Sequence, residues 1–182
     1  MIIDQNLLIE NIVIRNAYSD DLPALEWNGE LEKFRLLFQD VFRSSLRSEA
    51  VIWIADHKEE GIIGQLFVQL VSMRKELADG WERAYIYGFR IQPGFRGCGI
   101  GSKMLSVAET DLVKRGFRLV SLNVSRENTE ARKLYERNGY SVVAAEPGNW
   151  SYVDNQGKRQ QVYEPAWRME KLIWGKETLA DD

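Results

Sequence analysis

The sequence predicts a mixed α/β domain built around one main sheet. Strand-like and helix-like segments follow each other as a strand, helices, three strands, and then alternating helices and strands. A glycine-rich turn at residues 96–101 joins one of these strands to a helix. The chain has 182 residues, and at roughly 150 residues per domain that length predicts one domain.

The composition is typical of a globular protein, with 45% hydrophobic and 28% charged residues. We expect a single domain over residues 12–173, with terminal extensions at 1–11 and 174–182. No charge-free run reaches the length of about 18 residues that spans a bilayer, so no membrane partner is expected. Met1–Glu10 lacks the basic start of a secretory signal, which predicts a cytoplasmic location. The net charge of −3 argues weakly against a nucleic-acid partner.

One cysteine, Cys98, and one histidine, His57, exclude several classes of site. No intramolecular disulfide is possible, and zinc sites need three or four ligands, so we expect no metal. A hydrolase with a histidine base would have to use His57. Its polar surroundings at residues 56–61 predict an exposed hairpin turn, which is a poor place for a base.

The first half of the chain predicts one strand, a helical region and a hairpin. Ile12–Arg15 is a short apolar run typical of a strand, and capping side chains predict a helix start at Ser19. Apolar residues then recur at helical spacing from Leu22 to Leu46, and we expect them to line the core or a groove. The next strands are predicted at Val51–Ala55 and Ile62–Val71.

The second half predicts a fourth strand and then alternating helices and strands. Met73–Trp81 is polar and is expected to be a loop, and Arg83–Ile91 is the fourth strand. Its period-two alternation predicts that Tyr85, Tyr87, Phe89 and Ile91 share one face. Helices are expected at Ser102–Arg115 and Asn128–Arg137, and strands at Phe117–Val124, Tyr140–Ala145 and Trp167–Ile173. A polar loop carrying Asp154–Gly157 is expected between the last two strands.

The turn from Arg96 to Gly101 is the most informative stretch of the sequence. Glycines at 97, 99 and 101 let the backbone approach a ligand closely. Free amide groups at a helix start attract anions, and Arg96 adds a charge suited to phosphate. The turn therefore predicts a pyrophosphate-binding loop.

Two common phosphate-binding motifs fit this turn poorly. A Rossmann fingerprint requires Gly-x-Gly-x-x-Gly, but here the third glycine comes one residue early, and no acidic residue ends the following strand. A P-loop requires Gly-Lys-Ser/Thr, whereas Gly101-Ser102-Lys103 has the wrong order.

The spacing Arg96-x-x-Gly99-x-Gly101 resembles the signature of the GNAT superfamily of acyl-CoA-dependent N-acyltransferases. A second motif lies downstream, where Asn128-x-x-Ala131-x-x-Leu134-Tyr135-x-x-x-Gly139-Tyr140 is similar to the strand-then-helix segment of that family. The resemblance covers residues 12–173 and is specific to motifs from Phe89 to Tyr140.

The resemblance implies a mixed, mostly antiparallel sheet of about seven strands with flanking helices, splayed at the fourth and fifth strands. It implies acetyl-CoA as co-substrate, with its pantetheine arm paired to the backbone of the fourth strand and its pyrophosphate on the glycine turn. Tyr135 would be the general acid that protonates the leaving thiolate. The cofactor-binding residues implied are Phe89, Arg90, Ile91, Arg96, Gly97, Cys98, Gly99, Ile100, Gly101, Ser102, Asn128 and Tyr135.

The general base and the acceptor site are less clearly marked. Glu82 is the candidate base, although it has the opposite parity to Tyr85 and Tyr87, which could instead hold a relay water. The resemblance places the acceptor site between Glu26–Phe42 and Glu146–Gln161. An acidic and aromatic pocket for a cation could be formed there by Glu26, Trp27, Glu30, Trp150 and Asp154.

We therefore expect an N-acetyltransferase that acts on a primary amine of a small molecule or peptide without a covalent enzyme intermediate. A non-catalytic acyl-CoA-binding module of the same fold is the alternative, because the fourth strand has no glutamate in phase with its cofactor-facing residues. A Rossmann-type nucleotide-binding domain is a third reading that the glycine spacing disfavours. A homodimer through the carboxyl-terminal edge strands is left open.

Overall fold

The computed structural model describes residues 11–173, so the expected extensions lie outside the described residues, apart from residue 11. Its main sheet has seven strands in the order β1-β2-β3-β4-β5-β9-β6. Every neighbouring pair is antiparallel except β4 and β5. The strands are β1 (Ile12–Asn16), β2 (Ala50–His57), β3 (Gly61–Gln69), β4 (Arg83–Ile91), β5 (Leu119–Ser125), β6 (Ser141–Glu146) and β9 (Ala166–Leu172). The mixed α/β fold predicted from the sequence is confirmed.

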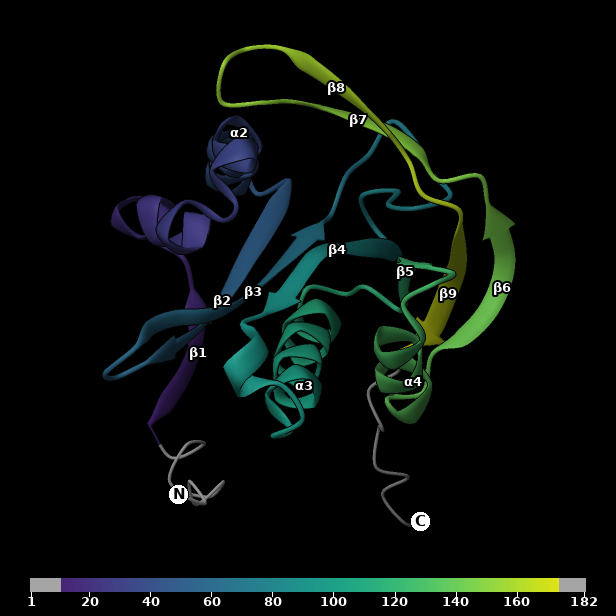
Figure 1. Cartoon of the computed structure of the whole chain (residues 1–182). Helices are drawn as coiled ribbons and strands as arrows, with labels where there is room; N and C mark the ends of the chain where they lie inside the picture. Colours follow the sequence, from purple (N-terminus) through teal and green to yellow (C-terminus); the bar gives the residue numbers. More distant parts are fainter. Residues whose placement is uncertain (1–10, 174–182) are drawn as a thin grey trace.

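Helices cover both faces of this sheet (Figure 1). One face carries α3 (Ile100–Lys114) and α4 (Thr129–Arg137), and the other carries the 3₁₀ helix η1 (Ser19–Gly29), the short η2 (Glu32–Phe34) and α2 (Arg35–Leu46). Each face buries its own hydrophobic cluster, with Met104, Leu105 and Leu112 on the α3 side and Phe38 and Phe67 on the α2 side. No helix among residues 11–173 is long and apolar enough to span a membrane.

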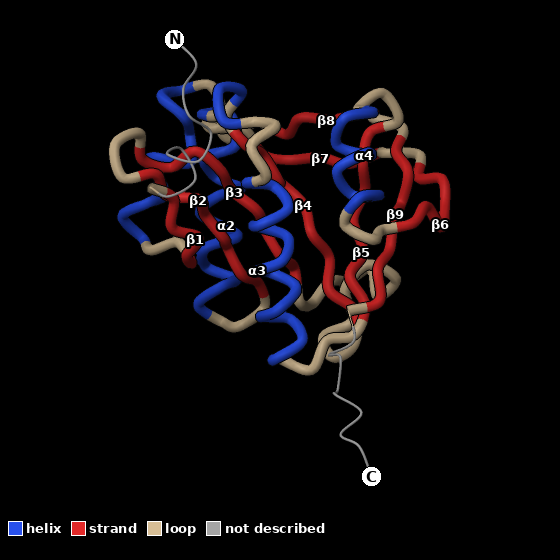
Figure 2. Tube along the Cα trace, turned by 90° about the horizontal axis from the view of Figure 1, so that it is seen from below, coloured by secondary structure: helices blue, strands red, loops and turns tan. Residues whose placement is uncertain are grey.

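The sheet opens between its two parallel strands. Pairing of β4 with β5 runs from Arg83↔Leu119 to Ile86↔Leu122 and then stops, although both strands continue. Figure 2 shows the two strands close together at one end and separated at the other, with α3 and α4 flanking the gap. The edge of β4 from Tyr87 to Ile91 therefore has no strand partner on the β5 side.

A bulge in β4 corrects the predicted alternation along this strand. Gln65 of β3 pairs with Arg90 while Phe67 pairs with Tyr87, so β4 holds one extra residue at this point. Gly88 accommodates the bulge with a φ of +58°. As a result Tyr87 packs with the α2 cluster, whereas Phe89 packs with the α3 cluster. The prediction that the tyrosines share a face with Phe89 is therefore wrong.

The helical region predicted from Leu22 to Leu46 is interrupted. Trp27 and Asn28 adopt left-handed backbone conformations, with φ of 46° and 56°. The chain therefore forms η1, then η2, and only then the regular helix α2. Leu25, Phe38 and Val41 are buried, whereas Leu46 is exposed, so the apolar spacing indicated many of the buried residues but not the break.

The predicted polar loop between the last two strands is a β-hairpin. It consists of β7 (Asn149–Val153) and β8 (Arg159–Tyr163), which pair antiparallel around the turn at Asp154–Gly157. Figure 1 shows the hairpin arching from the β6–β9 end of the sheet toward α2. At its base Gly148 lies so close to Glu164 that a Cβ atom would come within 1.7 Å of the Glu164 carbonyl oxygen.

His57 is buried, which corrects the predicted exposed position. It is the last residue of β2, and its Nδ1 accepts hydrogen bonds from the backbone amides of Glu59 and Glu60 at 3.2 and 3.1 Å. Its ring lies 5.5 Å from that of Phe95. Only the short turn after His57 is exposed, so the imidazole serves to hold that turn.

Candidate active site

The strand β4, the helix α3 and the helix α4 meet at one point beside the gap in the sheet. A Cβ atom at Gly101, in the first turn of α3, would lie 3.1 Å from Leu134 of α4 and 3.5 Å from Ile91 of β4. This contact brings the glycine turn, the free edge of β4 and α4 together. The two predicted motifs are thus neighbours in space.

The glycine turn presents a row of free backbone amides. No amide from Gly97 to Ser102 donates a hydrogen bond to another part of the described chain, and the first helical bond of α3 runs from Lys103 to Gly99. Gly97 and Gly99 have φ of 75° and 82°, and open space surrounds the place where a Cβ would stand. These amides lie at the amino end of a 15-residue helix, where the helix dipole favours an anion.

Side chains of the turn hold its two ends. Arg96 is exposed, and its Nε donates to the Ile91 carbonyl at 2.8 Å, which leaves its terminal nitrogens available. The Ser102 hydroxyl accepts a hydrogen bond from Asn138 Nδ2 at 2.9 Å, and this tie to the end of α4 was not predicted. Cys98 is partly buried, and its Sγ lies 3.5 Å from the Arg96 carbonyl oxygen.

Helix α4 brings Asn128 and Tyr135 to the gap. The Asn128 side chain accepts a hydrogen bond from the Ala131 amide at 3.1 Å, so it caps the helix as predicted and keeps its NH2 group free. The Tyr135 ring lies 6.4 Å from the ring of Phe89 and 5.9 Å from that of Tyr140. No described residue forms a hydrogen bond with the Tyr135 hydroxyl.

Tyr135 is a neutral phenol at neutral pH. Burial raises its pKa well above the ordinary value of 10.0, and the nearby Tyr85 raises it further. Tyr135 packs with the α3 cluster, on the face of the sheet opposite the Tyr87 ring. Its protonated hydroxyl can therefore donate a hydrogen bond or a proton on the α3 side of the gap.

The α2 face of the gap is lined by aromatic rings. Tyr85 and Tyr87 stack with centroids 5.8 Å apart and an interplanar angle of 7°. Burial raises the pKa of Tyr85 to about 12 and shifts that of Tyr87 in the same direction. The ring centroids of Phe34 in η2 and Tyr152 in the hairpin are 4.8 Å apart. The two segments predicted to frame the acceptor site, residues 26–42 and 146–161, therefore contact each other.

Sequence analysis did not identify Asn123 as a site residue. It lies one position beyond the last β4–β5 pair, and its flanking residues Leu122 and Val124 face the α3 cluster. Asn123 therefore faces the α2 side, where its Oδ1 is buried without a hydrogen-bond partner among the described residues. The signal in the sequence is one amide side chain in a strand whose other polar residues are Ser121 and Ser125.

The structure places the predicted base far from Tyr135. Glu82 precedes the first residue of β4 at the paired end of the two strands, and it is seven positions from Phe89. At about 3.3 Å per residue that is roughly 23 Å along the strand. Glu26 forms an ion pair with Arg35 at 2.6 Å. Asp154 accepts hydrogen bonds from the backbone amides of Gln156 and Lys158 in its own hairpin turn, so both of these predicted acceptor-site carboxylates are engaged within the protein.

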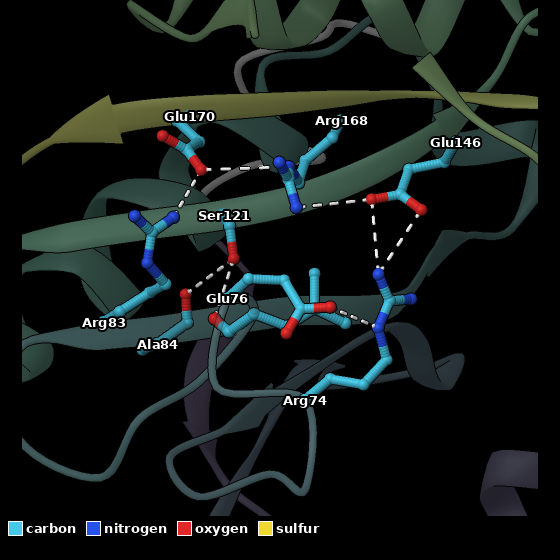
Figure 3. A network of polar contacts seen from close by, with 9 residues as sticks. Arg74, Glu76, Arg83, Ala84, Ser121, Glu146, Arg168 and Glu170 are labelled. Atoms are coloured by element: carbon cyan, nitrogen blue, oxygen red, sulfur yellow. Dashed lines mark hydrogen bonds and ion pairs between the residues drawn. The ribbon is translucent and has the colours of Figure 1, made fainter. Parts of the chain in front are cut away.

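An ion-pair network fixes the base of the hairpin to the sheet (Figure 3). Glu146, at the end of β6, contacts Arg168 of β9 at 3.3 Å and Arg74 at 3.4 Å. Glu170 pairs with Arg83, and Ser121 donates to the Leu77 carbonyl at 2.8 Å. The charges of the network balance, because it contains three arginines and three glutamates, namely Arg74, Arg83, Arg168, Glu76, Glu146 and Glu170. The network also positions the loop at residues 72–80.

Comparison with known proteins agrees with this arrangement. The sequence model of the Acetyltransferase (GNAT) family matches residues 13–140. The uncharacterised N-acetyltransferase YycN of Bacillus subtilis is 29% identical over 89 residues, which is 49% of this chain and 54% of that protein. A mycothiol acetyltransferase of Beutenbergia cavernae is 32% identical over 52% of this chain and 30% of its own length. The matched part spans about half or less of these relatives.

Solved structures share the fold over nearly the whole chain. Ard1 from Thermoplasma volcanium superposes with a TM-score of 0.68 at 18% identity, covering 91% of this chain and 99% of that one. NAA60 of Arabidopsis thaliana, solved in complex with acetyl-CoA, gives a TM-score of 0.66 at 21% identity, covering 89% and 98%. A spermidine N-acetyltransferase chimera, from Vibrio cholerae SpeG and hSSAT, gives 0.65 at 16% identity, covering 90% and 96%.

Proposed function

Because the chain belongs to the GNAT acetyltransferase family, we propose that it transfers the acetyl group of acetyl-CoA directly to a primary amine. The observation that carries this proposal is the row of free amides from Gly97 to Ser102 beside the unpaired edge of β4. A row of this kind at a helix start suits a pyrophosphate. An unpaired strand edge suits the amide groups of a pantetheine arm.

Each predicted cofactor residue has a distinct task in this proposal. The amides from Gly97 to Ser102 bind the pyrophosphate, and the free terminal nitrogens of Arg96 add positive charge. The backbone of Phe89, Arg90 and Ile91 pairs with the pantetheine arm. The free NH2 group of Asn128 donates to the arm from the opposite side of the gap.

The transfer requires one proton to leave the amine and one to reach the sulfur. The amine nitrogen attacks the thioester carbonyl carbon and releases a proton through a water molecule to the solvent. The C–S bond breaks, and the departing thiolate receives the proton of the Tyr135 hydroxyl, which is afterwards restored from the solvent. The raised pKa of Tyr135 keeps that proton in place before the reaction. A backbone amide on the free edge of β4 stabilises the negative charge that develops on the carbonyl oxygen.

The amine must be neutral to attack, although a free ammonium group has a pKa of about 10.4. The rings of Tyr85, Tyr87 and Phe34 disfavour a charged group by excluding water, which lowers the pKa of an amine bound among them. Tyr85 and Tyr87 are themselves neutral, so they hold a relay water rather than act as phenolate bases. The unpartnered Oδ1 of Asn123 accepts a hydrogen bond from the amine or from that water.

Calorimetric titration with acetyl-CoA, together with a CoA-release assay on a panel of amines, tests the proposal. Gly99→Ala places a methyl group in the row of amides and should weaken acetyl-CoA binding at least tenfold. Gly116→Ala, at the opposite end of α3, is the matched control, because both glycines have positive φ and open space around the Cβ position. Equal affinities of the two variants for acetyl-CoA would contradict the proposal.

A non-catalytic acyl-CoA-binding module is the second candidate. The distance of Glu82 from the gap favours it, because no carboxylate base is then supplied by β4. Acetyl-CoA binding without CoA release on any amine of the panel would support this candidate. Transfer to any amine, lost together with acetyl-CoA binding in Gly99→Ala, would exclude it.

A further inference from the structure

Arg90 occupies an unusual position beside the gap. The β4 bulge turns its side chain toward the α2 face, where its Cζ lies 5.0 Å from the centroid of the Phe34 ring. Its only polar contact with the described chain is from NH1 to the Gly88 carbonyl, at the 3.5 Å limit of a hydrogen bond. The guanidinium is therefore held by a ring and not by a carboxylate.

The lack of a carboxylate distinguishes Arg90 from the other partly buried arginines. Arg15, Arg83 and Arg168 each form an ion pair with an aspartate or glutamate, whereas Arg90 forms none within residues 11–173. Desolvation lowers the pKa of Arg90, and only the charge of the exposed Glu164 opposes this effect. A positive charge in such surroundings is costly unless an anion joins it.

Gln65 adds a second unsatisfied polar group at the same place. It lies directly opposite Arg90 in the β3–β4 ladder, so the two side chains leave the sheet on the same face. Gln65 is fully buried, yet neither its Oε1 nor its Nε2 has a hydrogen-bond partner in the described structure. Buried amides are normally satisfied, and an unsatisfied one calls for a missing partner.

We infer that the acceptor amine also carries a carboxylate, as an amino acid does, and that Arg90 binds this carboxylate with the Gln65 amide beside it. This inference rests on the proposed acetyl transfer and names its substrate class. A guanidinium matches a carboxylate with two parallel hydrogen bonds, and Gln65 Nε2 can donate a third. Binding would then satisfy both groups that the protein alone leaves unpaired.

Both the charge of Arg90 and its position in the structure suit the proposed reaction. Its side chain leaves β4 on the α2 face, the face that carries the Tyr87 and Phe34 rings proposed to surround the amine, so a group bound to Arg90 lies on the acceptor side of the gap. In an α-amino acid a single carbon separates the amino nitrogen from the carboxylate. A carboxylate on Arg90 would therefore hold the amine close to the thioester, and the positive charge would favour the neutral form of the amine.

The same surroundings disfavour a polycationic acceptor. Lys33 lies 5.1 Å from the centroid of the Phe34 ring, so two cations flank this ring. Two acids of this region are engaged, Glu26 by Arg35 and Glu32 by Asn155 at 2.6 Å, which leaves the exposed Glu164 as the carboxylate whose charge acts on Arg90. A polyamine would meet positive charge where it needs carboxylates.

A comparison of L-amino acids, the corresponding amino acid amides and spermidine in the CoA-release assay tests the inference. At least one amino acid should have a kcat/KM ten or more times that of its amide, and spermidine should be a poor acceptor. Arg90→Gln should raise KM for the amino acid about tenfold with little change in kcat, and should abolish the preference over the amide. Arg90→Lys should keep part of the preference for the amino acid. Arg43→Gln, at the exposed Arg43–Asp40 ion pair on α2, is the control and should change neither kcat nor KM.

Two further measurements separate this inference from its alternatives. The melting temperature of the CoA-saturated protein should rise with pooled N-acetyl amino acids but not with their amides, and this rise should be lost in Arg90→Gln. In the absence of ligand, Arg90→Gln should melt at the same temperature as the wild type or higher, since it removes an unpaired charge.

The inference would be overturned if amino acid amides or spermidine were acetylated at the same kcat/KM as the amino acids. It would also be overturned if Arg90→Gln changed neither the CoA-release kinetics nor the ligand-induced melting shift. Either result would leave the proposed acetyl transfer itself intact. A lower melting temperature of the ligand-free Arg90→Gln variant would instead indicate a structural role and would also overturn it. Failure to bind acetyl-CoA by calorimetry would overturn the proposed function itself.

Discussion

The ring of Tyr135 on α4 faces the ring of Phe89 on β4 at 6.4 Å, tilted by 47°. This contact crosses the point where β4 and β5 have separated, so the proposed acid of the reaction lies against the strand proposed to bind the pantetheine arm. The relationship depends on the bulge at Gly88, which turns Phe89 toward α4.

Tyr135→Phe should lower kcat about 100-fold or more while changing the affinity for acetyl-CoA less than about threefold, because only the proton donor is removed. Steady-state kinetics and calorimetry measure the two quantities. Tyr163→Phe, at a residue of β8 that is 72% exposed, is the control and should behave as wild type. An unchanged kcat in Tyr135→Phe would show that Tyr135 is not the acid.

Gly88→Ala should destabilise the protein by about 1–3 kcal/mol. The new Cβ would lie 2.6 Å from the Phe67 ring, on a backbone whose φ of +58° already disfavours a side chain. Urea denaturation measures the change. Gly94→Ala has open space and no positive φ, so it should leave the free energy of unfolding nearly unchanged. Equal stability of the two variants would mean that the bulge is not needed.

Glu146→Gln should lower the free energy of unfolding by about 1–3 kcal/mol, because it leaves Arg74 and Arg168 without their shared carboxylate. The estimate stays below that for a fully buried pair, since Arg74 is half exposed. Glu130→Gln, at the exposed pair with Lys133, should leave the free energy of unfolding nearly unchanged. A similar loss in both variants would show that the network does not anchor the hairpin.

The free energy of unfolding should fall as the pH rises above about 10. Burial raises the pKa of Tyr85 to about 12 and shifts those of Tyr87, Tyr135 and Tyr140 in the same direction. Above their ordinary pKa of 10.0, these phenols are ionised in the unfolded chain but still protonated in the folded one. Each of them therefore favours unfolding by up to about 1.4 kcal/mol per pH unit.

Urea denaturation at about pH 8 and about pH 11 measures this dependence, and Tyr87→Phe should make it shallower. A free energy of unfolding that is constant between the two pH values, or that increases, would contradict the burial of these hydroxyls.

The proposed cofactor side of the site rests on local signals in the sequence, whereas long-range contacts determine the rest. Gly97, Gly99 and Asn128 act through backbone conformation and capping, which depend on nearby sequence, so their pattern was visible. The bulge at Gly88 depends on the ring of Phe67 on a neighbouring strand, and alternation alone could not reveal it. A glycine inside a predicted strand was the available signal.

The hairpin and the helical break illustrate the same limit. Both hairpin strands are partly exposed, so their apolar residues mark no buried face, and the segment resembled a loop until its contacts with Phe34 and Glu32 were known. The left-handed residues Trp27 and Asn28 are stabilised by burial of the Trp27 side chain, which propensity does not report.

An NMR titration of the ¹⁵N-labelled protein with acetyl-CoA, with NAD titrated in parallel, tests the proposed acetyl-CoA site most directly. We expect saturable shifts at the backbone amides from Gly97 to Ser102 and from Phe89 to Ile91 with acetyl-CoA, and none with NAD. Shifts confined to other residues, or the same shifts with NAD, would contradict the assignment of this turn and strand edge as the acetyl-CoA site.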